Sequence, residues 1–165
     1  MLGATVKLAD GNAYLLYNGL AALRFDGEGE AVSRIFDDSA DGEKMLVNLA
    51  SALAEGGELA RRHLGYDSQK IPTAEDFLKF GNIAALRAVV MAAILSSVYI
   101  DGAAAEEEDL SLAEFEAAHK TARKTLDNIT ELAAYAASNG VSVKETLLLP
   151  LGSLQSVAEK LAEMR

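Results

Sequence analysis

The chain opens with an alternation of polar and apolar residues that predicts a β-hairpin. Residues 4–9 alternate, the turn-forming triplet Asp10-Gly11-Asn12 follows, and a second β-prone run covers residues 13–17. Glycine accepts the positive φ that tight hairpin turns need, so Asp-Gly between two such runs is a strong turn signal. Two strands alone are marginally stable in water. We therefore expect the hairpin to pack on other elements or to pair with another chain.

From residue 18 onward the apolar residues recur at helical spacing. The predicted helices of the first hundred residues cover 18–27, 30–36, 41–55, 59–64, 73–80 and 83–100. Asn18, Thr73 and Asn82 are predicted N-caps, because their side-chain oxygens accept hydrogen bonds from free amides of a first helical turn. Gly56-Gly57 is predicted to end the 41–55 helix, since glycine is a poor helix former.

The segment 83–100 is the most apolar part of the chain, with Arg87 as its only charged residue. Its 18 residues are at the short end for crossing a bilayer. No basic cluster flanks it, and the residues that follow are acidic. We interpret it as a central core helix surrounded by the others, rather than a membrane span.

The region after residue 100 begins with acidic residues and continues as helix. Residues 101–109 predict a linker, since the stretch 101–116 carries seven acidic residues and no basic one. Ser111 and Glu114 have the spacing of a capping box, which predicts a long helix ending at Asn139-Gly140. One narrow stripe runs along this helix: Leu112, Phe115, His119, Ala122, Leu126, Ile129, Ala133 and Ala136. Short helices are predicted from Ser142, which forms a second capping box with Glu145, to Leu149 and from Ser153 onward.

These patterns predict a mainly α fold, with an N-terminal β-hairpin followed by a helical bundle, then a C-terminal long helix and two short helices. The expected domains are residues 1–100, with the hairpin and helical core, and residues 110–165, the C-terminal helical region. The acidic linker 101–109 joins them.

Composition and charge narrow the function. The net charge is −10 and the chain has no cysteine. An acidic chain repels phosphate backbones, so we expect neither nucleic-acid binding nor attraction to anionic membranes. Without cysteine there is no disulfide, thiolate nucleophile or cysteine-ligated metal. The first nine residues lack a secretory pattern, and we expect an intracellular, cytoplasmic protein.

The residues give little sign of catalysis. His63 and His119 are far apart and neither has a metal-ligand neighbour at helical spacing; His63 is interpreted as a surface or helix-end residue. The run 106–109 offers carboxylates to a divalent cation, but it lacks the alternating ligands and central glycine of an EF-hand, which favours a solvated linker. We therefore expect no enzyme, no metal and no cofactor. An unrecognised carboxylate site is the enzymatic alternative, which a metal-dependent activity lost on mutating Glu107 would reveal.

The order of elements resembles one known family. The hairpin Val6-Lys7-Leu8-Ala9-Asp10-Gly11-Asn12-Ala13-Tyr14-Leu15-Leu16-Tyr17 leads into Asn18-Gly19-Leu20-Ala21-Ala22-Leu23. Then come Met45-Leu46-Val47-Asn48-Leu49-Ala50-Ser51-Ala52-Leu53, the helix start Pro72-Thr73-Ala74-Glu75-Asp76-Phe77 and the apolar helix. Over roughly residues 4–100 this looks like the tail assembly chaperones of long-tailed, siphovirus-like bacteriophages or prophages. The segment 135–151 resembles, more weakly, helical tails of related phage proteins.

The resemblance implies a function in tail morphogenesis. Such chaperones coat the tape-measure protein, keep it soluble and recruit major tail subunits during tube polymerisation in the host cytoplasm. It also implies a homo-oligomer, and in many phages a frameshifted longer form. The family has no catalytic residues to carry over.

Two questions stay open at this level. The hypothesis for the partner-binding surface is the stripe, through Leu112, Phe115, His119, Leu126 and Ile129, or grooves between the N-terminal helices. The stripe alternatively packs on the N-terminal core of the same chain. The competing function is a non-enzymatic helical adaptor or regulatory protein that binds a single protein partner.

Overall fold

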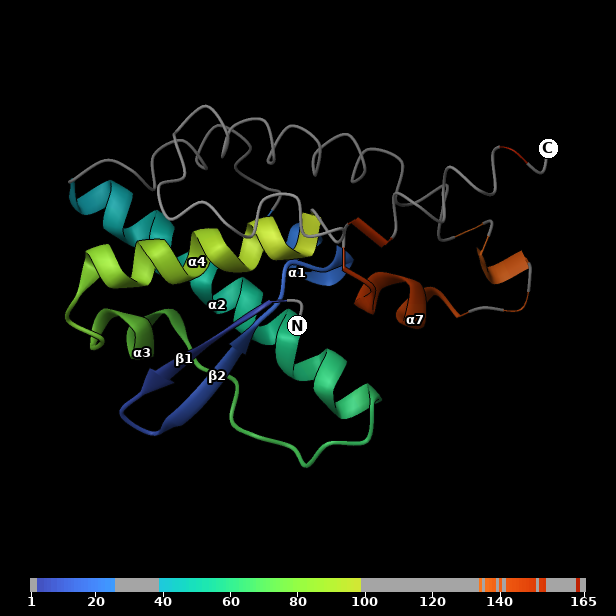
Figure 1. Ribbon diagram of the computed structural model, residues 1–165, viewed down its shortest axis with the longest axis horizontal. Coiled ribbons are helices and arrows are strands. Elements are labelled where there is room, and N and C mark those ends of the chain that lie inside the picture. The colour runs from blue at the N-terminus through green and yellow to red at the C-terminus, as the bar shows by residue number, and fades with distance from the viewer. Residues whose placement is uncertain are drawn as a thin grey trace.

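The computed structural model describes residues 3–25, 39–98, 134, 136–138, 140, 142–150, 152–153 and 163, and Figure 1 shows their arrangement. The described part is mainly helical, with a two-stranded antiparallel hairpin packed against helices. The elements are β1 (Ala4–Leu8), β2 (Gly11–Leu15), α1 (Gly19–Phe25), α2 (Ala40–His63), α3 (Ala74–Leu78), α4 (Ile83–Val98) and α7 (Val143–Leu148).

The predicted hairpin is confirmed. β1 pairs with β2 so that Val6 faces Ala13 and Leu8 faces Gly11, and Gly11 has the positive φ of 133° that the turn requires. Val6, Ala13 and Leu15 are buried, whereas Thr5 and Lys7 of β1 are exposed. The hairpin packs through its apolar face against α2 and α4, which supplies the burial that two strands lack by themselves.

The prediction that Gly56-Gly57 ends a helix is wrong. α2 runs without interruption through both glycines and takes in the separately predicted turns at 59–64. The glycines lie where α2 meets the hairpin. A Cβ at Gly57 would be 2.0 Å from the carbonyl oxygen of Tyr14, and one at Gly56 would be 2.5 Å from Oδ1 of Asn18. Their lack of a side chain permits this close packing, which outweighs their low helix propensity.

The predicted caps of the following helices are confirmed. Thr73 caps α3 and forms a capping box with Asp76, and Asn82 accepts a hydrogen bond from the Ala85 amide at 3.0 Å. α2 begins slightly earlier than predicted, because Ser39 caps it by accepting from the Gly42 amide at 3.1 Å.

α4 enters the core through only part of its surface. Leu86, Val90 and Ile94 are buried there, while Ala84, Ala88 and Ala92, spaced four residues apart, are exposed. The prediction of a core helix is therefore confirmed for one face, whereas the alanine face is not covered by the described residues. Within the described residues, no helix is long and apolar enough to cross a membrane.

The C-terminal region packs back onto the N-terminal helices. α7 carries the predicted capping box of Ser142 and Glu145 and contacts α1 and α2. Pro150 forms an isolated antiparallel bridge with Asn18. Where the sequence predicts a long helix followed by short ones, the described C-terminal helical segments are short, and Ser153, a predicted cap, is itself helical.

Several predictions lie outside the described residues. They are the helix 30–36, the linker 101–109, and the long helix except for a few residues near its end, of which Ala136 is buried. The domain boundaries accordingly stay a prediction.

Candidate functional site

A buried asparagine holds α1 in place against α2. Asn18 is fully buried; its Oδ1 accepts from the Ala21 amide at 3.0 Å, as the predicted cap requires. Its Nδ2 donates to the carbonyl of Gly56 at 2.9 Å and to that of Leu148 at 3.4 Å. One side chain thus joins α1, α2 and α7. It thereby fixes the direction in which α1 carries Arg24 and Phe25.

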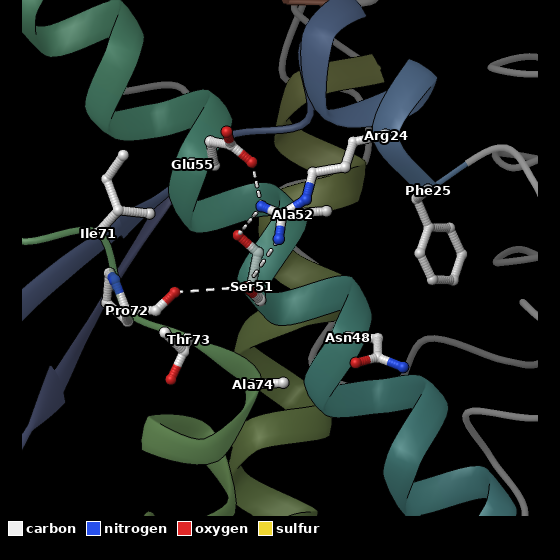
Figure 2. Close-up of a pocket in the computed structure, with 10 residues that line it drawn as sticks. All are labelled: Arg24, Phe25, Asn48, Ser51, Ala52, Glu55, Ile71, Pro72, Thr73 and Ala74. Atoms are coloured by element: carbon white, nitrogen blue, oxygen red, sulfur yellow. Dashed lines mark hydrogen bonds and ion pairs between the residues drawn. The ribbon is translucent and has the colours of Figure 1, made fainter.

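These two residues form one wall of a cleft of about 660 Å³. The middle of α2 is its floor and residues 71–74 are its opposite wall, as Figure 2 shows. The lining residues are Arg24, Phe25, Asn48, Ser51, Ala52, Glu55, Ile71, Pro72, Thr73 and Ala74. This volume is in the range of sites that take a small molecule or a few side chains of a partner.

Arg24 organises the polar part of this cleft (Figure 2). Its Nη1 forms an ion pair with Glu55 and also donates to the Ser51 carbonyl at 3.4 Å. Ser51 is buried, and its Oγ donates to the carbonyl of Pro72 at 3.3 Å. The guanidinium is about half exposed, so the ion pair contributes little to stability. The ion pair instead places a positive and a negative charge in the lining of the cleft.

The remaining lining is suited to binding. Phe25 and Ile71 are partly buried apolar side chains on opposite walls, and Asn48 is an exposed amide on α2. The Ser51 hydroxyl is engaged with Pro72, and Glu55 is engaged with Arg24. Neither group is placed as a nucleophile with its own base. Apolar side chains on the walls together with a few polar groups are what a side chain of a partner requires.

A second, more polar cleft of about 440 Å³ lies between the hairpin turn and α3. Lys70 stands there between two carboxylates, 3.7 Å from Asp10 and 3.5 Å from Asp76. The hydrogen bond from the Thr73 backbone, helped by Lys70, lowers the pKa of Asp76 below its ordinary value. The charges of this second cleft are paired with one another, as Arg24 and Glu55 are in the first, and its volume is the smaller of the two.

Between the two clefts a buried carboxylate ties the segment before α3 to α2. Glu58 accepts from the Gln69 amide at 2.6 Å, from Arg61 at 2.7 Å and from Arg62 at 3.1 Å. Burial by itself raises the pKa of Glu58, but these hydrogen bonds outweigh it and hold the pKa below its ordinary value.

Glu58 is therefore expected to make stability depend on pH in acid. Because its pKa is lower in the folded chain, its contribution is full above the unfolded value of about 4.3 and is lost as the pH falls through the folded value. Urea unfolding of the wild type and of Glu58→Gln, at pH 7 and at successive values below 5, measures this. The difference in stability between the two should shrink in acid; a constant difference would contradict the assignment.

The residues singled out by sequence fall mostly elsewhere. The stripe residues Leu112, Phe115, His119, Leu126 and Ile129 lie outside the described residues, as does the acidic run 106–109. His63 is the last residue of α2 and partly exposed, which confirms its interpretation as a helix-end residue; its Nε2 lies 3.9 Å from Glu145. In the part of the chain that the structure describes, no three metal-ligating side chains come together.

Sequence reasoning named grooves between the N-terminal helices as an alternative binding surface but did not locate this cleft, although its floor left a signal. Asn48, Ser51 and Glu55 are polar positions three and four residues apart within the stretch 45–57, whose other residues are apolar or glycine. That spacing places them on one face. Their partner Arg24 was not foreseeable, because the direction of α1 depends on the buried Asn18. Comparisons of the chain with protein-family models, curated proteins and solved structures gave no match.

Proposed function

We propose that this protein is a tail assembly chaperone, which binds the tape-measure protein of a long-tailed phage or prophage and recruits tail tube subunits. The order of hairpin, short helix, long helix, capped helix and apolar helix supports the proposal, since the resemblance rests on that order. The observation that carries it is the cleft at Arg24. It offers apolar walls and both signs of charge on the surface of a small helical domain.

The client segment that suits this cleft is an amphipathic helix. A helix laid into a groove inserts one or two apolar side chains and keeps its polar face in water. Phe25 and Ile71 supply the apolar walls, and Arg24 and Glu55 supply partners for charges of either sign. A long helix-rich client offers such segments repeatedly. Several copies of the chaperone, acting in the bacterial cytoplasm, then cover it together.

Filling the cleft is expected to reduce client capture. Asn48 is exposed at the cleft, so Asn48→Tyr places a ring there without disturbing the core. Co-expressed with a tagged tape-measure protein, this variant should be captured at least tenfold less than the wild type. Lys44→Tyr is the matched control, one turn earlier on α2, exposed and outside the lining. Undiminished capture of Asn48→Tyr would exclude the cleft as the client site.

The stripe hypothesis is tested in the same assay. Phe115→Asp combined with Leu126→Asp should abolish capture if the stripe binds the client, and leaves it unchanged if the cleft alone does. The DNA flanking the gene identifies the client to be used: a very long helical reading frame downstream and a major tail gene upstream are expected. If the flanking genes are instead ordinary cellular genes, and light scattering shows a complex with a small, fixed number of subunits, the protein is the single-partner adaptor.

A further inference from the structure

One segment of irregular chain borders both clefts. Residues 64–73, called the strap here, leave the end of α2 and return to the start of α3, as Figure 1 shows in green. Ile71, Pro72 and Thr73 line the first cleft, whereas Gln69, Lys70 and Pro72 line the second. The position of the strap therefore sets the width of both.

At its start the strap continues from α2, with the Gly65 and Tyr66 amides donating to the carbonyls of Arg62 and Arg61 at 3.1 Å; beyond Tyr66 it is held to α2 at two points. Near its middle, the Gln69 amide donates to Glu58 at 2.6 Å and the Gln69 carbonyl accepts from Arg62 at 2.8 Å. Near its end, the Pro72 carbonyl accepts from Ser51 at 3.3 Å. Ser51 and Glu58 are seven residues apart, which is about two turns of one helix face. These two hydrogen-bonded attachments, called pins here, are the contacts of Gln69 with Glu58 and of Pro72 with Ser51. They fix a segment without regular structure to a rigid helix.

Apolar burial contributes little to holding the strap. Residues 64–70 are exposed, including Leu64 and the ring of Tyr66, which rests on Arg61 with 5.4 Å between the guanidinium carbon and the ring centroid. Ile71 and Pro72 are only partly buried. A segment with few buried apolar contacts opens locally at a much lower free energy than the core. The hydrogen bonds of Gln69 with Glu58 and Arg62, and that of Pro72 with Ser51, are therefore what keeps it closed.

We propose that the strap is a movable wall of the Arg24 cleft, and that the pin between Glu58 and Gln69 controls its opening. When this pin is released, residues 67–70 leave α2 and the Ile71–Thr73 wall, then held only by the bond between Ser51 and Pro72, moves outward, hinged at Tyr66 and at the cap of α3. The cleft, which in the closed position has room for a few side chains, then widens and admits a bulkier client segment. The opening is a property of the chain alone; its use in client binding rests on the proposed function.

Hydrogen exchange of the full chain without client tests the opening. Glu58→Gln keeps the shape of the side chain but presents an amide to Arg61 and Arg62, which weakens the pin. The Gln69 amide, which donates to Glu58, should exchange about tenfold faster in this variant, with the amides of the hairpin and of α4 unchanged. Glu55→Gln is the matched control, since Glu55 lies one turn away and pairs with Arg24 instead. It should leave strap exchange as in the wild type.

Equal strap exchange in wild type, Glu58→Gln and Glu55→Gln would overturn the proposal, and so would equal acceleration by both variants. If Glu58→Gln does not fold, Arg62→Ala carries the test. It removes the donors to Glu58 and Gln69 from a partly exposed side chain, and the same acceleration is expected. Faster exchange without any client capture would refute the chaperone function and leave the movable strap standing.

Discussion

Gly57→Ala is expected to destabilise the protein by about 3 kcal/mol or more, although alanine is the better helix former by about 1 kcal/mol. The added Cβ would lie 2.0 Å from the carbonyl oxygen of Tyr14 and 2.8 Å from its carbonyl carbon. Both atoms belong to the backbone of β2, which cannot rotate away as a side chain does. α2 and the hairpin must therefore separate, and the buried contacts between them weaken together.

Urea unfolding measured by circular dichroism gives the free energy of unfolding for this comparison. The matched control is Lys44, an exposed position of the same helix. There Lys44→Gly should be less stable than Lys44→Ala by about 1 kcal/mol, as helix propensity predicts. A Gly57→Ala variant as stable as the wild type would show that α2 and β2 do not approach as closely as described.

Asn18→Ala is expected to cost about 2–3 kcal/mol, well above the loss of a cap alone. The cap of α1 disappears, since Ala21 loses its acceptor, and the carbonyl of Leu148 loses the donor that joins it to α1. The fully buried site leaves no water to replace them. Detachment of the segment around Leu148 should accompany the loss, seen as faster hydrogen exchange in α7.

Asn82→Ala provides the matched control, because Asn82 makes the same capping bond at the same 3.0 Å but is exposed. We expect that variant to lose only about 1 kcal/mol. Combining Asn18→Ala with Gly56→Ala should cost less than the sum of the two single losses, because the Gly56 Cβ would otherwise meet Oδ1 of Asn18 at 2.5 Å. Equal losses for Asn18 and Asn82 would contradict the role of Asn18 as a junction.

Local hydrogen bonding explains why parts of the fold were predictable. The turn at Gly11, the caps at Asn18, Thr73 and Asn82 and the box of Ser142 with Glu145 each involve residues within four positions of one another. Their chemistry is decided before any distant contact forms. The residues that determine where these elements begin and end are therefore neighbours in the sequence, and the elements can be predicted from it.

The path of α2 shows where such reasoning fails. Within the sequence, Gly56-Gly57 is a helix end, because the only visible consequence of two glycines is a loss of helix propensity. In the folded chain their missing side chains admit the backbone of Tyr14 and the amide of Asn18, nearly forty residues away. The gain from that packing exceeds the local cost, and the helix continues.

The Arg24 cleft and the strap, like the path of α2, depend on contacts between distant parts of the chain. The polar spacing of Ser51 and Glu55 on α2 is visible in the sequence, but Arg24 and Pro72 reach them only because α1 and the strap are placed by other contacts. In the sequence, Glu58 looks like an ordinary surface acid. Only the folded chain brings the Gln69 amide to it as a hydrogen-bond donor. Secondary structure here follows from bonds between near neighbours. The site follows from how distant segments pack, which only the tertiary structure decides.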